Sequence, residues 1–168
     1  MSLRDLLLGN YKTVSERLGL TIEAADSRLR IYGVVDAIPM QMWFGAHSTH
    51  TSAQLLSPAP VELGIVTTSL FDKVAGFFGA DHGKLGDPAF DAVFSVKSPD
   101  LAKLAGMLSA DVRLVLLQMA AEGLHPAVDR NTVHLRRFSN GGGDDEAVIE
   151  RDFHETARLV RALAPTFV

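Results

Sequence analysis

The hydrophobic period of this chain changes after its first twenty residues, and that change limits the folds open to it. Apolar side chains in residues 3–18 recur at helical spacing, whereas those in residues 28–66 alternate with other side chains, as they do in strands. Residues 31–80 hold only four charged side chains, so we expect this stretch to supply most of the core. The pattern predicts an N-terminal helix followed by a block of strands.

The strand pattern is clearest in a predicted β-hairpin. In residues 29–35 and 40–44, side chains expected on one face of a strand alternate with side chains expected on the other. Asp36 and Ala37 form a short turn between these two segments. Further strands are predicted over residues 48–54, 61–65, 90–96 and 132–138. Because the strands come in a block and do not alternate regularly with helices, the sequence predicts an α+β fold with a mainly antiparallel sheet of about four to six strands. The chain has 168 residues, the size of a single domain over residues 1–168.

Five helices are predicted to pack on this sheet: one N-terminal, a central set and one C-terminal. A serine begins four of them, because its hydroxyl can accept a hydrogen bond from a backbone N–H of the first turn. These N-cap serines are Ser2, Ser69, Ser98 and Ser109. The predicted helices cover residues 3–18, about 70–78, 101–108, 110–122 and about 146–164, and Gly19, Gly79 and Gly123 end three of them.

Composition excludes several classes of site. The chain has no cysteine, so it has no disulfide, no thiolate metal site and no cysteine nucleophile. Its net charge of −4 argues against a uniformly basic nucleic-acid surface but leaves a local basic patch open. No run approaches the roughly 18 apolar residues of a membrane span, and no secretory start is recognised. We therefore expect a cytoplasmic protein with no cofactor, no membrane span and no nucleic-acid partner.

One segment resembles a known group of proteins. The motif Gly86-Asp87-Pro88-Ala89-Phe90-Asp91 leads into the apolar residues 92–96, and it is similar to a Gly-Asp-Pro-x-Phe-Asp turn and strand in uncharacterised bacterial proteins. The resemblance extends over residues 86–135 and implies a bacterial protein with no established activity. Several proteins of that group carry membrane-spanning segments before the domain. In physical terms the Asp-Pro pair begins a turn, Phe90 enters the core and Asp91 can cap the amides of the turn.

His47 and His50 form the one close pair of histidines, and neutral imidazole is a common zinc ligand. Residues three apart on a strand point to opposite faces, so both could bind one ion only if the chain turns between them. A third ligand would come from a carboxylate or from one of the other histidines, which are His82, His125, His134 and His154. The alternative is a pair of exposed loop histidines. A metal-dependent or other small enzyme that uses this loop is the second functional hypothesis.

The richest concentration of aromatic and methionine side chains lies in the predicted hairpin and second helix: Met40, Met42, Trp43, Phe44, Phe77 and Phe78. Such a set can line a pocket for a small apolar ligand or form a protein interface, and core packing is the alternative. Trp43 lies on the strand face opposite to Met42 and Phe44, so the hairpin is apolar on both faces. Either two layers cover it or one face meets a second chain. The mean hydropathy of +0.15 favours a homo-oligomer through residues 40–44.

Three further patterns are assigned to structure rather than to chemistry. Residues 79–86 are glycine-rich but lack the glycine and hydroxyl positions of a phosphate loop, and residues 140–145 lack the alternating ligands of a calcium loop. Asp152 and His154 point in different directions on the predicted C-terminal helix, so they do not form a nucleophilic set with Ser139. We expect no catalytic residue among them.

A small basic cluster lies in and near the last predicted strand and comprises Arg130, His134, Arg136 and Arg137. A solvated edge strand protected by charge explains it as well as a partner does. The leading functional hypothesis is a non-enzymatic binding or protein-interaction module that self-associates.

Overall fold

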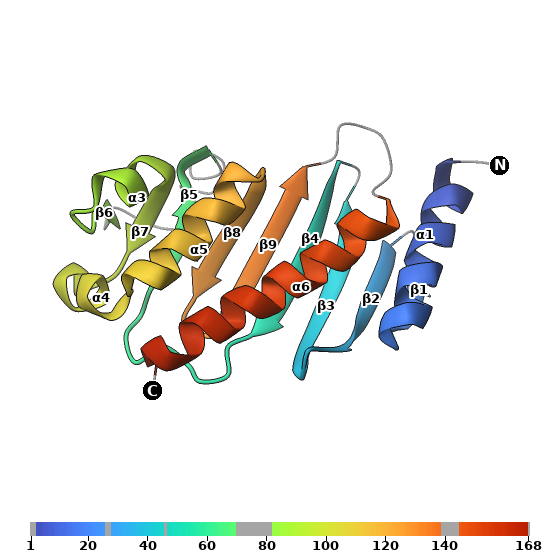
Figure 1. Cartoon of the computed structure of the whole chain (residues 1–168), viewed down its shortest axis with the longest axis horizontal. Helices are drawn as coiled ribbons and strands as arrows, with labels where there is room; N and C mark the ends of the chain where they lie inside the picture. The colour runs from blue at the N-terminus through green and yellow to red at the C-terminus, as the bar shows by residue number, and fades with distance from the viewer. Residues whose placement is uncertain (1–2, 26–27, 46, 70–81, 139–144, 168) are drawn as a thin grey trace.

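The computed structural model describes residues 3–25, 28–45, 47–69, 82–138 and 145–167. These residues form one sheet in the order β1-β2-β3-β4-β9-β8-β5-β7-β6, and the neighbouring strands pair in antiparallel fashion (Figure 1). The α+β class and the antiparallel sheet are confirmed. The sheet is nevertheless larger than the predicted four to six strands, since it has nine, of which β6 is only two residues long.

The strands alternate with helices only in the second half of the described chain. The strands are β1 (Thr21–Ala25), β2 (Arg28–Val35), β3 (Ile38–Gly45), β4 (Ser48–Gln54), β5 (Gly64–Thr67), β6 (His82–Gly83), β7 (Phe94–Lys97), β8 (Leu124–Asp129) and β9 (Thr132–Phe138). The helices are α1 (Leu3–Leu18), α3 (Pro88–Val93), α4 (Leu101–Met107), α5 (Ala110–Ala121) and α6 (Glu146–Leu163), and a 3-10 turn over Ala164–Phe167 follows α6.

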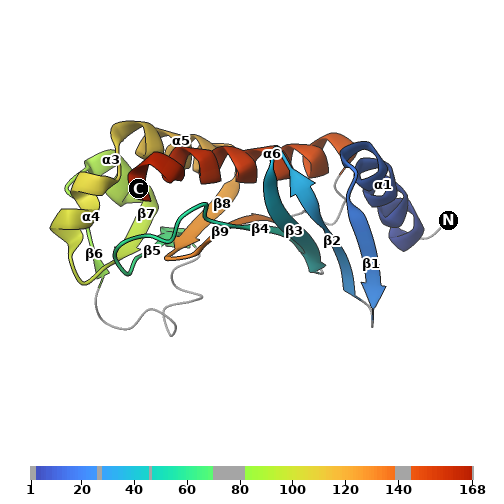
Figure 2. The same ribbon diagram turned by 90° about the horizontal axis from the view of Figure 1, so that it is seen from below.

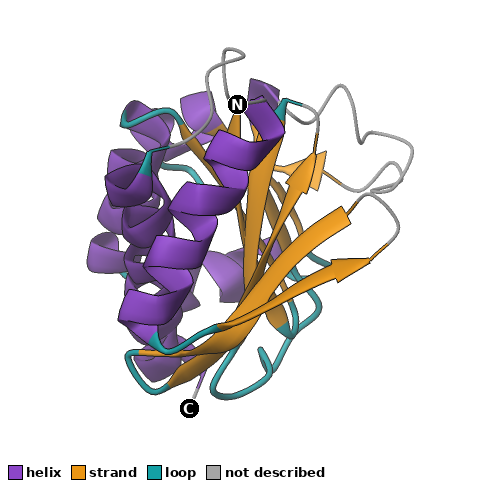
Figure 3. Ribbon diagram, turned by 90° about the vertical axis from the view of Figure 1, so that its right-hand side faces the viewer, coloured by secondary structure: helices purple, strands orange, loops and turns teal. Residues whose placement is uncertain are grey.

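Helices lie against one face of the sheet (Figures 2 and 3). α6 crosses β2, β3, β4 and β9, α5 packs on β8 and on α6, and α1 lies against β1, β2 and α6. We call these three helices the helical layer. The core lies between this layer and the sheet, and its most deeply buried side chains include Ile31, Met42, Leu135, Ile149 and Phe153. The predicted amphipathic C-terminal helix is therefore the main cover of the strands.

Among the described residues, no single helix has both the length and the apolar character needed to cross a bilayer. Taken together, α4 and α5 pass that test by length and composition, but they meet at a bend of 89°.

The first helix and the hairpin form as the sequence predicts. α1 ends at Leu18, and Gly19 follows with a φ of +67°, the left-handed conformation that glycine adopts without a steric penalty. β2 and β3 are joined by Asp36 and Ala37 alone, whose φ angles are 54° and 66°. Two consecutive residues with positive φ are typical of a type I′ turn, whose twist matches that of the paired strands.

α6 also holds this turn. His154 Nδ1 lies 3.0 Å from Asp36 Oδ2, and Arg161 Nη2 donates to the Asp36 carbonyl oxygen at 2.8 Å. The hydrogen bond from His154 lowers the pKa of Asp36 below its ordinary value. These contacts offset part of the cost of the left-handed turn.

One predicted N-cap is correct and another is displaced. The Ser109 hydroxyl caps α5 by accepting from the N–H of Val112 at 3.3 Å. α4 begins instead after Asp100, whose carboxylate accepts from the N–H of Lys103 at 2.9 Å. Ser98 bonds the N–H of Asp100, too early in the chain to cap the helix. A carboxylate near the helix start also interacts favourably with the helix dipole, which explains the displacement.

Of the other two predicted caps, one is wrong and one is not tested. The backbone is already helical at Thr68 and Ser69, so Ser69 lies inside a helical turn and does not precede it. Ser2 and the predicted helix over residues 70–78 lie outside the described residues.

The predicted strand over residues 90–96 is partly wrong. Asp87 accepts from two backbone N–H groups of the following turn and caps the short helix α3, so the strand β7 begins only at Phe94. Phe90 is fully buried, as expected. Asp91 accepts from two N–H groups of the preceding loop at 2.8 and 2.9 Å, which agrees with its predicted capping role. Local capping outweighs the apolar pattern here.

The strands β1, β6 and β8 are additions to the predicted sheet. In β8 the buried residues Leu124, Pro126 and Val128 do alternate, but a proline within a short run argues against a strand. Pro126 pairs with Leu135 of β9, whereas the ladder between β8 and β5 includes only Ala127, Val128 and Asp129. Pro126 thus lies at a local edge of the sheet, where a strand tolerates proline. The predicted strand over residues 61–65 is shifted and begins at Gly64.

Arg137 and Asp152 tie β9 to α6. The Arg137 Nε donates to both carboxylate oxygens of Asp152 at 3.1 and 3.0 Å, and Nη2 donates to the same carboxylate. The two side chains are only 12% and 3% exposed. A buried charge without its partner is costly, so each side chain depends on the other.

Ala37 should be strained, because a residue with a Cβ avoids positive φ. We expect Ala37→Gly to raise the free energy of unfolding by about 1 kcal/mol, measured by urea denaturation. The control Ala102→Gly, at an exposed position of α4, should lower it by about the same amount. An Ala37→Gly chain less stable than the original would contradict the assigned turn.

Removal of one member of the buried ion pair should be far more damaging than removal of both. We expect Asp152→Leu to lower the free energy of unfolding by about 3–5 kcal/mol, because Arg137 is left buried and unpaired. The double variant Asp152→Leu with Arg137→Met should be more stable than Asp152→Leu alone, as a double-mutant cycle would measure. Glu155→Gln breaks an exposed pair with Arg158 and should be nearly neutral. Additive losses from the two single variants would refute this interpretation.

Candidate functional site

The face of the sheet opposite to the helical layer carries the candidate site. No described helix packs on this face (Figure 2), and we call it the open face. Strand side chains alternate between the two faces, so the neighbours of buried Ile31, Met42 and Leu135 point toward the open face. The functional side chains of this face are therefore found by following the strand register.

A single row of side chains runs across the open face. In the register, Arg30 of β2 lies opposite Trp43 of β3, Trp43 opposite His50 of β4, His50 opposite Arg136 of β9, and Arg136 opposite His125 of β8. We call these five residues the transverse row. These five members are cationic or aromatic or can become cationic, although the chain as a whole is acidic with a net charge of −4. Beyond Arg30 the register continues to Glu23 of β1, whose carboxylate lies 3.7 Å from the Arg30 guanidinium.

Aromatic contacts order this face. The Trp43 and His50 rings are stacked, with centroids 5.5 Å apart and planes inclined by 5°. The Arg136 guanidinium carbon lies 4.5 Å from the centre of the Phe138 ring, and Arg30 lies 4.8 Å from that of Tyr32. Cations over aromatic rings at these distances attract the rings electrostatically. The open face thus carries aromatic rings in contact with one another and with guanidinium groups.

Ser48 links His50 to Arg136. The Ser48 Oγ lies 3.0 Å from His50 Nε2 and accepts from Arg136 Nη2 at 3.4 Å. Burial lowers the pKa of His50 below its ordinary value, and the charges of Arg136 and His134 lower it further. The neutral imidazole can accept the Ser48 proton. Its basicity is reduced, however, and among the described residues no carboxylate bonds its other nitrogen, so the pair lacks the orienting group of an activated serine.

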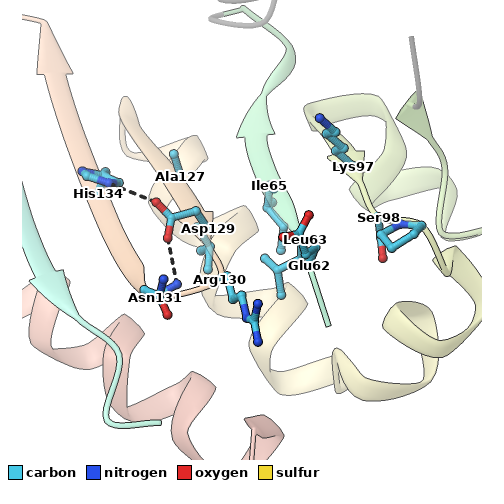
Figure 4. Close-up of a pocket in the computed structure, with 13 residues that line it drawn as sticks. Glu62, Leu63, Ile65, Lys97, Ser98, Ala127, Asp129, Arg130, Asn131 and His134 are labelled. Carbon is cyan, nitrogen blue, oxygen red and sulfur yellow. Dashed lines mark hydrogen bonds and ion pairs between the residues drawn. The ribbon is translucent and has the colours of Figure 1, made fainter. Parts of the chain in front are cut away.

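A hollow of about 570 Å³ adjoins the row, over the strands β5, β7, β8 and β9 (Figure 4). Gly64 and Ala127 are among its lining residues, and the lack of a side chain on glycine and the single methyl group of alanine leave space there. Lys97 and His134 lie on opposite sides of β5 in this view. His134 Nε2 is 3.6 Å from Asp129 Oδ2. Since Asp129 also accepts from the N–H groups of the next turn, it is held in place beside the hollow.

The two histidines of the predicted metal site have different surroundings. Among the residues that the structure describes, no group of three or more histidine, aspartate or glutamate side chains is arranged to hold a metal ion. His47 is exposed, whereas the His50 ring stacks on Trp43. The geometry therefore gives no support to the alternative of a metal-dependent enzyme on this loop.

The predicted apolar site is divided between the two faces. Met40 and Met42 are buried beneath the helical layer, and the Phe44 ring lies 3.8 Å from that of Tyr11, as the core-packing alternative expects. Of the four described members of this set, Trp43 alone lies on the open face, where it is partly exposed. Phe77 and Phe78 lie outside the described residues.

The predicted basic cluster is divided in the same way. β9 is not an edge strand, because β4 and β8 pair with its two sides. Arg137 points to the helical layer and binds Asp152, whereas Arg136 points to the open face. Of the rejected nucleophilic set, His154 binds Asp36 and Asp152 binds Arg137, whereas Ser139 lies outside the described residues.

Sequence reasoning misses Arg30 and His125, and it does not connect Trp43 with Arg136. The available signal is their placement at alternate positions of strands, on the side opposite to the apolar residues. That signal shows which residues of one strand share a face. It does not give the order of the strands, and this order is what brings residues 30, 43, 50, 136 and 125 into one row.

Comparison with known proteins shows one solved structure with a similar fold. No family model and no curated protein matches the chain. A solved structure, the crystal structure of the mycobacterial trehalose monomycolate transport factor A, TtfA, is similar with a TM-score of 0.64 and 10% sequence identity. The match covers 95% of this chain and 93% of that one. At this identity the likeness shows that the two chains share a fold over nearly their whole length.

The pKa of His50 can be measured through Trp43, the one tryptophan of the chain. Protonation of His50 puts a positive charge against the stacked indole ring, so Trp43 emission should change on acidification. We expect the midpoint to lie below pH 6.5, the ordinary pKa of histidine. His50→Gln should abolish the transition, and Arg136→Gln should move its midpoint upward. A midpoint at or above 6.5 in the unaltered protein would contradict the described surroundings of His50.

Proposed function

We propose that this protein is a non-enzymatic binding module and that the open face is its binding surface. One observation carries the proposal: the transverse row gathers two arginines, two histidines and a tryptophan on a sheet face that no described helix covers. Exposed concentrations of arginine and aromatic side chains are typical of binding surfaces.

The hairpin supports the same proposal. The helical layer covers one face of the hairpin, where Ile31, Met40 and Met42 are buried. On the other face Trp43 remains partly exposed and Phe138 is 38% exposed. Burial of large aromatic side chains on the outer face of a sheet contributes favourable free energy to the binding of a ligand or partner.

Binding agrees better than catalysis with the electrostatics of the row. Arg136 lies beside His50 and lowers the pKa of its imidazole, so a general base at this position would be weakened. The fold likeness to TtfA agrees with a binding role, because TtfA is a transport factor.

The partner on the open face could be a second copy of this chain, as the sequence predicts. Because Met40 and Met42 face the helical layer, a second copy would meet the hairpin through the open face, at Trp43. A twofold interface centred on Arg136 would bring two guanidinium groups together, which is unfavourable. We therefore favour a partner of different chemistry and keep the homodimer as the alternative occupant, to be detected by light scattering.

The single tryptophan makes the binding face testable in cell extract. With 5-fluorotryptophan at position 43, the ¹⁹F resonance should shift or broaden in an extract of the cells that make the protein. The matched control carries Trp43→Phe and Leu114→Trp, which moves the probe to a position of α5 that is 53% exposed; its resonance should not change. A response of the control alone would overturn the proposal.

The non-enzymatic part of the proposal has a separate readout. A small ligand retained by the purified protein and released by denaturation should keep its mass after prolonged incubation with the protein. A product of different mass that accumulates with time would contradict a pure binding role.

A further inference from the structure

Arg136 differs from the other partly buried arginines. Three arginines of the described chain are partly buried: Arg113, Arg136 and Arg137. Arg113 lies 3.4 Å from an Asp87 carboxylate oxygen and also donates to two backbone carbonyls, and Arg137 donates to the Asp152 carboxylate. Among the described residues, no carboxylate lies within 4 Å of Arg136.

The described residues use little of the hydrogen-bonding capacity of Arg136. Among them its one hydrogen bond goes from Nη2 to the Ser48 hydroxyl, at the long distance of 3.4 Å, and its buried Nε has no partner. Phe138 supports the guanidinium from one side. A guanidinium withdrawn from water without a counter-ion is costly, and its planar donors match the oxygens of a carboxylate or a phosphate.

The neighbours of Arg136 supply an imidazole whose charged form is disfavoured and an aromatic flank. His50 lies opposite it on β4, and His134 is near enough to His50 to lower the pKa of that ring. Trp43 is two strands away, which corresponds to about 10 Å across a sheet. An anionic group at Arg136 would therefore place the rest of a ligand along the His50 and Trp43 rings.

We propose that Arg136 anchors an oxyanion-binding site, which takes the carboxylate or phosphate of a ligand whose ring or apolar part lies along His50 and Trp43. The site rests on the proposed function, because it lies on the open face. The hollow beside His134 continues the same surface and offers Lys97 as a second cation for a ligand with two anionic groups.

Phenyl phosphate and benzoate are suitable probes, and benzamide is the neutral control. Binding is followed by Trp43 emission and by NMR shifts of open-face residues at constant ionic strength, because exposed charges are screened by salt. We expect both anions to bind saturably and benzamide not to bind. The stronger of the two anions identifies phosphate or carboxylate as the preferred group.

Arg136→Gln should weaken binding of the anions at least tenfold. The matched control Arg151→Gln removes the same charge from an exposed position of α6 and should leave binding unchanged. Without ligand, Arg136→Gln should keep or raise the melting temperature, whereas Arg137→Gln should lower it, since only Arg137 has a carboxylate to lose. A folded Arg136→Gln variant that is no less stable removes the objection that lost binding reflects unfolding.

Two outcomes would overturn the oxyanion site and remain distinct from failure of the proposed function. If the anions shift open-face residues equally in Arg136→Gln, the open face still binds but Arg136 is not its anchor. If neither anion shifts any open-face residue at millimolar concentration, no oxyanion site exists there. The extract experiment with Trp43 decides the binding face independently of both results.

Discussion

The packing of α6 across β2, β3, β4 and β9 determines what the two faces of the sheet can do. α6 buries an apolar stripe that includes Ile149, Phe153 and Val160 against alternate residues of these strands. The pleat then sends the remaining side chains of the same strands to the opposite face. One layer of helices thus decides both where the core lies and which side chains form the transverse row. The Arg137–Asp152 ion pair fixes this helix to a strand of the row, β9.

Arg136 and Arg137 are neighbours in sequence and have opposite surroundings. Arg137 meets a buried carboxylate supplied by α6, and so its charge is compensated within the chain. Arg136 is partly withdrawn from water on the other face, where the described residues supply a hydroxyl and aromatic rings but no carboxylate. A dipeptide of two arginines gives no hint of this difference. It follows from the strand period of two, together with a helical layer on one side only.

Much of the local structure could be predicted from the sequence, because its causes are local. The helix over residues 3–18, the turn at Asp36 and Ala37, and the Ser109 cap depend on residues close together in the chain. The nine-strand order could not be predicted, since β4 pairs with β9 across a long stretch of intervening chain. Three of the four neighbour relations in the transverse row join strands that are consecutive in the chain. The fourth joins His50 to Arg136 and requires that long-range pairing, so the sequence alone does not bring these two residues together.

The net charge of −4 belongs to the whole chain and does not describe the surroundings of Arg136. The helical layer carries charges of both signs, since α6 has Glu146, Glu150 and Glu155 but also Arg151, Arg158 and Arg161. A sheet and the helices packed on it are separated by about 10 Å, which is close to the Debye length at physiological ionic strength. An anion at Arg136 therefore interacts mainly with the side chains of the open face. A composition that argues against a uniformly basic protein is for this reason compatible with an oxyanion site on one face.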